Sequence, residues 1–313
     1  MLASKARLIV AGAGIALMLA ACSGATTPIS PSPSLPGASN VARHGWISPA
    51  AKHQKLLYVT DYTESAVLVY KQNDTSGGPI GEITTGIDGP EGDAVDKSGT
   101  LYVANNANST VTEYPKGSES PTVTLSTGIV DPLDVSVDSK GIVYVMDNSA
   151  SQILEFKPGS TSPDATVSLS KPSDGTNAKN DDLYVSYNSS GGHVARCKPL
   201  ATTCTDLGIS VGLAQGIALD LKGNLLLGDV FAEAINVYKP KKTQPFRTIS
   251  TYLEQPAKLA LSKTDATFFM ADPANFAVEI YNYARGTLEY SFTFGSGNEL
   301  EGVALSPGQP PGK

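Results

Sequence analysis

Histidine and cysteine are scarce in this chain of 313 residues, which has three of each. No His-Glu-x-x-His or Cys-x-x-Cys motif is present, so the usual signatures of zinc peptidases and of dithiol redox sites are missing. His44 and His53 precede most of the apolar segments, and His193 stands far from both in the sequence. A surface position on a strand is therefore expected for His193 rather than a role as a general base.

Positive charge is also in short supply, because 23 Lys and Arg face 30 Asp and Glu and the formal net charge is -7. Affinity for nucleic acids comes mainly from Lys and Arg that neutralise phosphates, so no nucleic-acid partner is expected. The one dense basic cluster, Lys239 with Lys241 and Lys242, is interpreted as a solvated loop. Charged residues make up only 17% of the chain and hydrophobic residues 41%, which favours a packed core over disorder.

The apolar run near the N-terminus is too short to span a bilayer comfortably. It extends over 14 residues, from Leu8 to Ala21, whereas a membrane-spanning helix needs about 20. Lys5 and Arg7 precede it, and small residues end it, an order that is typical of an export signal. Its last part, Leu19-Ala20-Ala21-Cys22, resembles the lipobox of bacterial lipoproteins.

This resemblance implies that residues 1–21 are a lipoprotein signal peptide and that cleavage leaves a lipidated Cys22. Several acyl chains hold a protein durably on a membrane, since each buried methylene contributes roughly 0.8 kcal/mol. We therefore expect an exported protein of the bacterial cell envelope, anchored in the membrane by its lipidated N-terminus. A soluble secreted protein with an unmodified Cys22 is the alternative.

Residues 22–50 are rich in Pro, Ser, Thr and Ala and contain few bulky apolar residues. A packed core cannot form from such a composition, so we predict a semi-extended tether. The apolar repeats occupy residues 51–308, and residues 309–313 are predicted to form a disordered tail.

Short β-type runs recur along residues 51–308 with a nearly constant period. Their central residues are spaced 44, 42, 40, 42 and 43 positions apart, which is the length of one four-stranded propeller blade. A second strand follows in each repeat, marked by Tyr or Phe twelve residues after the centre in five repeats and by Cys197 in the other. The runs are Leu57-Tyr58-Val59, Leu101-Tyr102-Val103, Val143-Tyr144-Val145, Leu183-Tyr184-Val185, Leu225-Leu226-Leu227 and Phe268-Phe269-Met270.

Two more strands are predicted in the repeat, one before the central run and one after the strand that follows it. Together with those two strands they give four strands per repeat. The preceding strand is seen in Pro90–Asp96 and leads into the turn Asp96-Lys97-Ser98-Gly99, where Asp caps the backbone and Gly supplies positive φ. The first repeat lacks this strand, whereas Leu300–Ser306 matches it and has no following partner. We therefore predict an all-β, six-bladed β-propeller whose ring is closed by the C-terminal strand pairing in the first blade, which removes open edge strands.

The fourth repeat departs most from the pattern. Pro172–Asn180 lacks the apolar alternation of an inner strand, so an irregular blade is expected there. An acidic or amide residue follows the central run in the other five repeats, and its recurrence points to a turn cap rather than to catalysis. These residues are Asp61, Asn105, Asp147, Asp229 and Asp272.

In order along the chain, the repeat reads Pro-x-Gly-apolar-Ala-apolar-Asp, a turn with Gly, Leu-Tyr-Val-Ala-Asp/Asn, and Val-x-apolar-Tyr. It resembles the repeat of the NHL-repeat and SMP-30/gluconolactonase-like six-bladed propellers. The resemblance covers nearly all of residues 51–308. It implies the fold strongly and the function weakly, because this architecture carries lactonases, other hydrolases, lyases and plain binding proteins.

Cys197 and Cys204 remain once Cys22 is assigned to the lipid. They bracket a turn that contains Pro199, between the third and fourth strands of the fourth repeat. In an oxidising compartment such a pair is expected to form a disulfide. Metal or redox chemistry is the alternative, although that would favour a shorter spacing or a nearby His.

The starts of the inner strands are expected to form a ring around the central channel, where a ligand would bind. Alignment of these strands puts six polar or charged residues at two adjacent levels of the ring: Glu91, Asp134, Asp174, Gln215, Lys258 and Glu301. Glu91 and Glu301 come from neighbouring blades and could share calcium, which takes six to eight oxygen ligands. The alternative to a bound metal is that the carboxylates are solvated in the channel or paired with Lys258.

The gluconolactonase-like resemblance implies a divalent metal held by Glu, Asn and Asp from separate inner strands, which would polarise a lactone carbonyl. Glu91 or Glu301 matches the position of the family's Glu ligand, and Asp174 matches that of its Asp ligand. No Asn stands at the matching level of the ring. We therefore expect a cell-envelope propeller that binds a small molecule, a glycan or an envelope protein without catalysis. The alternatives are a metal-dependent lactonase or esterase with its site at the central channel, and a scaffold in a larger envelope complex.

Overall fold

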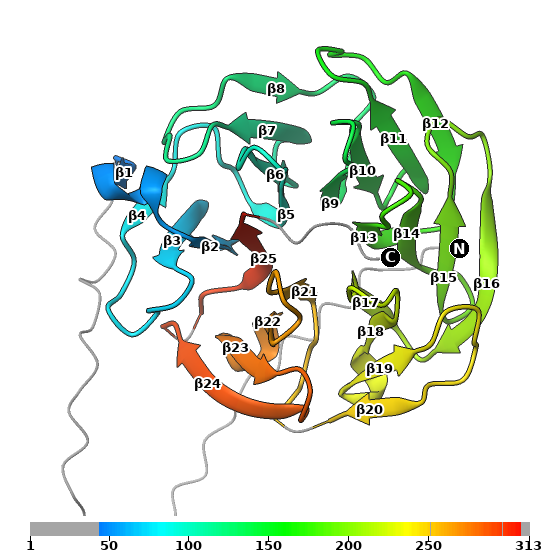
Figure 1. Cartoon of the computed structure of the whole chain (residues 1–313). Helices are drawn as coiled ribbons and strands as arrows, with labels where there is room; N and C mark the ends of the chain where they lie inside the picture. The colour runs from blue at the N-terminus through cyan, green and yellow to red at the C-terminus, as the bar shows by residue number, and fades with distance from the viewer. Residues whose placement is uncertain (1–43, 251, 296, 308–313) are drawn as a thin grey trace, which may run out of the picture. The chain divides into compact units, whose positions relative to one another are not determined.

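Six antiparallel sheets form a ring in the computed structural model, which describes residues 44–250, 252–295 and 297–307 (Figure 1). Blade 1 contains β25 (Leu300–Ser306), β2 (Leu56–Asp61), β3 (Ala66–Lys71), β4 (Gly81–Ile83) and β1 (Trp46–Ile47). Blade 2 contains β5 (Pro90–Val95), β6 (Leu101–Asn105), β7 (Thr110–Tyr114) and β8 (Val123–Leu125). Blade 3 contains β9 (Pro132–Val137), β10 (Val143–Asp147), β11 (Gln152–Phe156) and β12 (Ala165–Ser168).

The remaining three blades have the same four-stranded order. Blade 4 contains β13 (Pro172–Asn177), β14 (Leu183–Asn188), β15 (Gly192–Cys197) and β16 (Cys204–Val211). Blade 5 contains β17 (Ala214–Leu219), β18 (Leu225–Asp229), β19 (Ala234–Tyr238) and β20 (Arg247–Ile249). Blade 6 contains β21 (Lys258–Leu261), β22 (Thr267–Asp272), β23 (Ala277–Asn282) and β24 (Thr287–Thr293). Short 3-10 helices cover Pro49–His53, Val230–Ala232 and Pro273–Asn275.

The C-terminal strand closes the ring, as predicted. β25 pairs antiparallel with β2, so that Tyr58 lies opposite Ala304 and Val59 opposite Val303. β25 also contacts the inner strands of blades 2 and 6. Both chain ends of the propeller are therefore held in one blade, and the six-bladed prediction is confirmed.

Blade 1 carries one strand more than predicted. Trp46 and Ile47, which the composition assigned to the tether, form β1 and pair with Glu82 and Gly81 of β4. The folded part therefore begins before residue 51. A two-residue strand needs only backbone hydrogen bonds to an exposed sheet edge, and composition carries no signal for such a contact.

The recurring aromatic and aliphatic residues pack between blades, as expected of a core. Tyr281 is fully buried and stacks on Phe268, with the ring centroids 4.7 Å apart. Ala218, Leu226 and other residues of blade 5 belong to the same cluster. Burial of each such side chain stabilises the fold by about 1.5–3 kcal/mol, and the repeats build six such clusters, each shared by two neighbouring blades.

The turns after the inner strands explain the recurring Asp. Asp138 Oδ1 accepts hydrogen bonds from the backbone N–H groups of Lys140 and Ile142, at 2.8 and 2.9 Å. Gly141 takes the left-handed conformation in the same turn, with φ of 83°. Blade 4 has no glycine at this position, and Asp181 takes it instead with φ of 67°.

The inner strand of blade 4 is complete, so the expectation of a disrupted strand there is wrong, although β15 and β16 show a register shift between His193 and Ala195. β13 pairs with β14 through Gly175 opposite Val185 and Asn177 opposite Leu183, with one register shift near its start. Apolar alternation is not required here because the polar side chains of β13 find partners in the channel. The Asn177 Oδ1 atom, for example, accepts a hydrogen bond from Ser136 Oγ at 2.6 Å.

The predicted disulfide is present. Cys197 ends β15, Cys204 begins β16, and their sulfur atoms are bonded. The two residues also lie opposite each other in the strand pairing. The bond therefore joins the outer two strands of blade 4 beside the turn that contains Pro199.

Several predicted features lie outside the described residues. These are the signal peptide, Cys22, most of the tether and the C-terminal tail. Within the part of the chain that the structure describes, no helix is long and apolar enough to cross a membrane.

Candidate functional site

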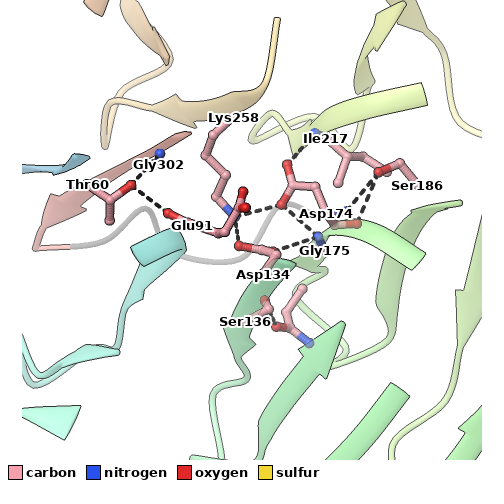
Figure 2. A network of polar contacts seen from close by, with 11 residues as sticks. Thr60, Glu91, Asp134, Ser136, Asp174, Gly175, Ser186, Ile217, Lys258 and Gly302 are labelled. Carbon is pink, nitrogen blue, oxygen red and sulfur yellow. Dashed lines mark hydrogen bonds and ion pairs between the residues drawn. The ribbon is translucent and has the colours of Figure 1, made fainter. Parts of the chain in front are cut away.

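Three of the predicted channel residues form a buried ion triad (Figure 2). The Lys258 Nζ atom lies 2.5 Å from Asp134 Oδ1 and 2.6 Å from Asp174 Oδ1. All three side chains are less than a tenth exposed. Because β21 belongs to blade 6 and the two acids to blades 3 and 4, the lysine side chain reaches across the channel.

Both carboxylates also bind the backbone of the next blade. Asp134 Oδ2 accepts from the Gly175 N–H at 2.9 Å, and Asp174 Oδ2 accepts from the Ile217 N–H at 2.7 Å. The triad thus links the inner strands of blades 3, 4, 5 and 6. Carboxylates that receive several hydrogen bonds and a cation are satisfied in a way that offsets their desolvation.

The charges of the triad hold Lys258 as a cation. Burial alone would lower the pKa of Lys258, but the charges of Asp134 and Asp174 raise it above its ordinary value. Lys258 is therefore not available as a neutral amine nucleophile near pH 7. The alternative of carboxylates paired with Lys258 describes Asp134 and Asp174 correctly.

Gly92 makes room for the triad. A Cβ atom at this position would lie 2.1 Å from Asp134 Oδ1. The same level of β25 carries Gly302, where a Cβ atom would lie 2.7 Å from Asp93 Oδ1. Glycine at these two levels therefore allows acidic side chains of adjacent blades to enter the centre of the ring.

Asp93 is a further buried acid beside the triad. Its side chain is 1% exposed, and neither carboxyl oxygen has a hydrogen-bond partner among the described residues. Burial raises the pKa of Asp93 to about 8, with Lys258 lowering it and Asp174 raising it further. The carboxyl group is therefore protonated near pH 7 and can donate a hydrogen bond.

The channel contains a cavity of about 410 Å³ next to Asp93 and Lys258. The inner strands of all six blades line it, together with Lys97, Ser139 and Lys263 in the turns that follow these strands. It thus extends toward the ends of the inner strands and not toward their starts, where a ligand was expected. The buried side chains of Asp134, Asp174 and Lys258 are in contact with one another at the other end.

Asn177 is a second polar side chain of the cavity wall. Its Oδ1 accepts from Ser136, while its Nδ2 has no partner among the described residues. The amide is 8% exposed. Asp93 and Asn177 thus give the wall two buried donor groups on separate blades.

The remaining predicted residues do not join the triad. Glu91 and Glu301 are half-buried on the neighbouring strands β5 and β25, and the backbone oxygen of Glu91 accepts a hydrogen bond from Thr60. Gln215 lies on β17, and its Oε1 has no partner among the described residues. These three residues do not line the cavity.

The donor set does not fit a calcium or lactonase-type metal. In the described part of the chain, no three His, Cys, Asp or Glu side chains gather closely enough to hold an ion. Asp174, the expected acidic ligand, is bound by Lys258 and by the backbone of Ile217. A cation at Asp174 would have to displace the lysine ammonium.

The acids after the central runs act as turn caps, as expected. Asp147 accepts from the backbone N–H groups of Val130 and Asp131, at 3.1 and 2.7 Å. Asp272 accepts in the same way from Glu254 and Gln255. They fix the loops that enter each blade and are not catalytic candidates.

His193 lies on β15 with its ring 5.3 Å from that of Tyr187, and it is half-buried. Ser210 lies opposite it on β16, inside the segment Gly208-Ile209-Ser210-Val211-Gly212. These letters match the Gly-x-Ser-x-Gly motif, but a nucleophile elbow is a strand-to-helix turn and Ser210 lies within a strand. The pair gives no support for a catalytic triad.

Asp93, Ser136 and Asn177 were missed in the sequence. Asp93 could have been found from the aligned inner strands, because it is an acid at a level where other strands have apolar residues. These residues are Val135, Ile217, Leu259 and Val303. A single acid in an otherwise apolar column is a departure that favours function over packing. The amide of Asn177 has no such signal, since it ends β13, whose whole sequence lacks apolar alternation.

Comparison with solved structures agrees with this geometry. A chain of a nidogen/laminin complex matches with a TM-score of 0.65 and 15% identity, over 82% of this chain and 100% of that one. A protein of unknown function from Bacteroides caccae matches with a TM-score of 0.63 and 10% identity, over 80% and 98%. Virginiamycin B lyase from Staphylococcus aureus matches with a TM-score of 0.58 and 12% identity, over 80% and 83%.

These likenesses show the β-propeller fold. At such identities they show the fold alone, and the similar propellers include both a lyase and a chain of a binding complex. No protein-family model and no curated protein matches the chain. Function must therefore be argued from the channel itself.

Proposed function

We propose that this propeller is a binding protein whose central channel takes a small, oxygen-rich molecule such as a sugar, without catalysis. The observation that carries the proposal is the 410 Å³ cavity with Asp93 and Asn177 in its wall. A cavity of this size, with apolar side chains and buried polar groups in its wall, is within the range of small-molecule sites.

The chemistry of the wall favours a ligand rich in acceptor oxygens. Protonated Asp93 and the Asn177 amide both offer donors that no described residue uses. Burial of a donor without a partner costs about 1–3 kcal/mol, and a hydroxyl, carbonyl or ether oxygen of a ligand would recover that cost. Lys258 lies at the inner end of the cavity, where Asp134 and Asp174 already neutralise its charge.

The same geometry disfavours catalysis. Asp134 and Asp174, the acids that could serve as a general base, are bound by Lys258 and by the backbone of the next blade. Lys258 is held charged. Asp96 and Asp138, which also line the cavity, accept hydrogen bonds from the backbone of their own turns. The carboxylates around the cavity are thus already engaged, which supports binding over hydrolysis.

Binding in the channel can be tested by ligand-observed NMR with neutral monosaccharides, sugar acids and small lactones as probes. We expect binding to the wild-type domain and at least a tenfold loss of affinity in Asn177→Ala, which removes a donor, and in Ala260→Leu, which fills the cavity. Ala165→Leu on the outer strand β12 is the matched control and should bind like the wild type. Unchanged binding in Ala260→Leu, or no binding of any probe to the wild type, would contradict the channel site, and turnover of a lactone would contradict the absence of catalysis.

We further propose that the propeller is displayed on the bacterial cell envelope through lipid at Cys22. The lipobox-like tetrad and the Pro-rich segment after it support this. Because Cys197 and Cys204 are bonded to each other, Cys22 is the one remaining cysteine. In a bacterial host, labelled fatty acid should enter the wild type and not Cys22→Ser, and only the wild type should partition with membranes. Equal labelling of both, or a secreted and unlabelled wild type, would rule out the anchor.

A further inference from the structure

A second cavity, of about 660 Å³, lies at the seam between blades 1 and 6. The loop after β3, which includes Gln72 to Ser76, forms one side of it. The turn after β21 and the outer strands of blade 6 form the other side. Lys263 and Pro307 line both this cavity and the channel cavity, so the two cavities are neighbours. We call this second cavity the seam groove.

Tyr290 presents an aromatic face in the seam groove. Its side chain is 41% exposed. Behind it the ring stacks on Phe292, with centroids 6.2 Å apart, and Phe292 lies 5.1 Å from Tyr70 of blade 1. The ring is thus held in place by a cluster of aromatic rings that spans the seam, which lowers the entropy that a ligand must remove on stacking.

The rest of the groove is rich in hydroxyl and amide groups. Gln72, Asn73, Thr75, Ser76, Ser262 and Thr264 contribute to its lining. Its charges balance, because Lys55 and Lys263 are matched by Asp74 and Glu289. The protein as a whole carries a net charge of -7, so a polyanion would be repelled at a distance. An uncharged ligand with many hydroxyl groups fits this surface better than an acidic one or an apolar helix.

We propose that the seam groove binds an uncharged oligosaccharide, with Tyr290 stacking on one sugar ring and the chain end entering the channel cavity. The aromatic face accommodates the apolar C–H side of a sugar ring, and the flanking amides and hydroxyls bond its equatorial oxygens. This deepens the proposed function and rests on it, since the channel supplies the site for the terminal sugar. In this proposal the groove is the feature that makes the protein bind oligosaccharides more tightly than single sugars.

The test compares neutral glucan and chitin oligomers of one to six sugars by titration calorimetry on the mature domain. We expect at least a tenfold gain in affinity from the monosaccharide to the hexasaccharide of the preferred series. Tyr290→Ala should remove most of this gain and leave monosaccharide affinity unchanged, while Tyr290→Phe should retain it. Phe246→Ala, at a residue that is 50% exposed and not in the groove, is the matched control and should bind like the wild type.

The titrations distinguish failure of the groove proposal from failure of the channel proposal. If monosaccharides bind but longer chains bind no more tightly, or if Tyr290→Ala keeps the gain, the groove proposal is wrong and the channel site stands. If only a small carboxylate or lactone binds in the channel, the groove proposal is again wrong. If no probe binds, both proposals fall. An oligogalacturonate that binds more tightly than every neutral hexamer would overturn the choice of an uncharged chain.

Discussion

Replacement of Lys258 by Met is expected to lower the free energy of unfolding by about 3–5 kcal/mol at pH 7. The lysine side chain is the shared cation of Asp134 and Asp174, which are 1% and 2% exposed. Without it, two buried carboxylates face each other with no counter-charge. For a domain of this size the midpoint of thermal unfolding should fall by roughly 5–10 °C.

The same substitution should be nearly harmless once the acids are neutral. Asp134→Asn and Asp174→Asn keep an oxygen that can accept from Gly175 and Ile217. The triple variant with Lys258→Met should therefore recover most of the lost stability. Lys140→Met is the matched control, because Lys140 pairs with Asp181 at 3.1 Å but its own side chain is 66% exposed, so its loss should cost only about 1 kcal/mol. Equal effects of Lys258→Met and Lys140→Met in chemical denaturation would show that the triad does not hold the blades together.

The ring was predictable because one physical requirement repeats six times. Each blade must bury the face of its second strand, and Tyr58, Tyr102 and Tyr144 mark that face at a near-constant period. Closure was predictable because Leu300–Ser306 carries the pattern of an inner strand with no blade of its own. Local propensity, spacing and the need to cover edges all indicate the same fold.

The centre of the channel was only partly predictable. Alignment placed Asp134, Asp174 and Lys258 at one level, because strands of a propeller share a register. It could not show that the lysine would cross the ring to the two acids, since this depends on channel width and side-chain length. The open end of the cavity was not predictable for the same reason.

Blade 4 shows a second limit. Polar residues replace the apolar alternation of its inner strand, and the sequence alone cannot tell a disrupted strand from one that faces polar partners. Asp174 and the Asn177 Oδ1 atom find their partners about 40 to 85 positions away, in Ser136, Ile217 and Lys258. Pairing over such distances carries no local signal.

Raising the pH from 4 to 8 is expected to destabilise the propeller through Asp93. Its pKa is about 8 in the folded state, against 3.8 ordinarily, because burial disfavours the charged form and Asp174 adds to this. Between these two values the folded state holds a proton that the unfolded state has lost. The stability contributed by protonated Asp93 is therefore complete below about pH 4 and falls by about 1.4 kcal/mol per pH unit until about pH 8.

Asp93→Asn isolates this contribution, because Asn resembles the protonated acid in shape and does not titrate. The variant and the wild type should unfold at the same denaturant concentration near pH 4, and the variant should be more stable at pH 8, by up to about 5 kcal/mol. Glu155 and Glu279, whose pKa values burial raises to about 7, titrate in both proteins, so they cancel in the difference. Two stability curves that run parallel from pH 4 to 8 would mean that Asp93 is ionised in the fold, and the donor that the channel site requires would then be absent.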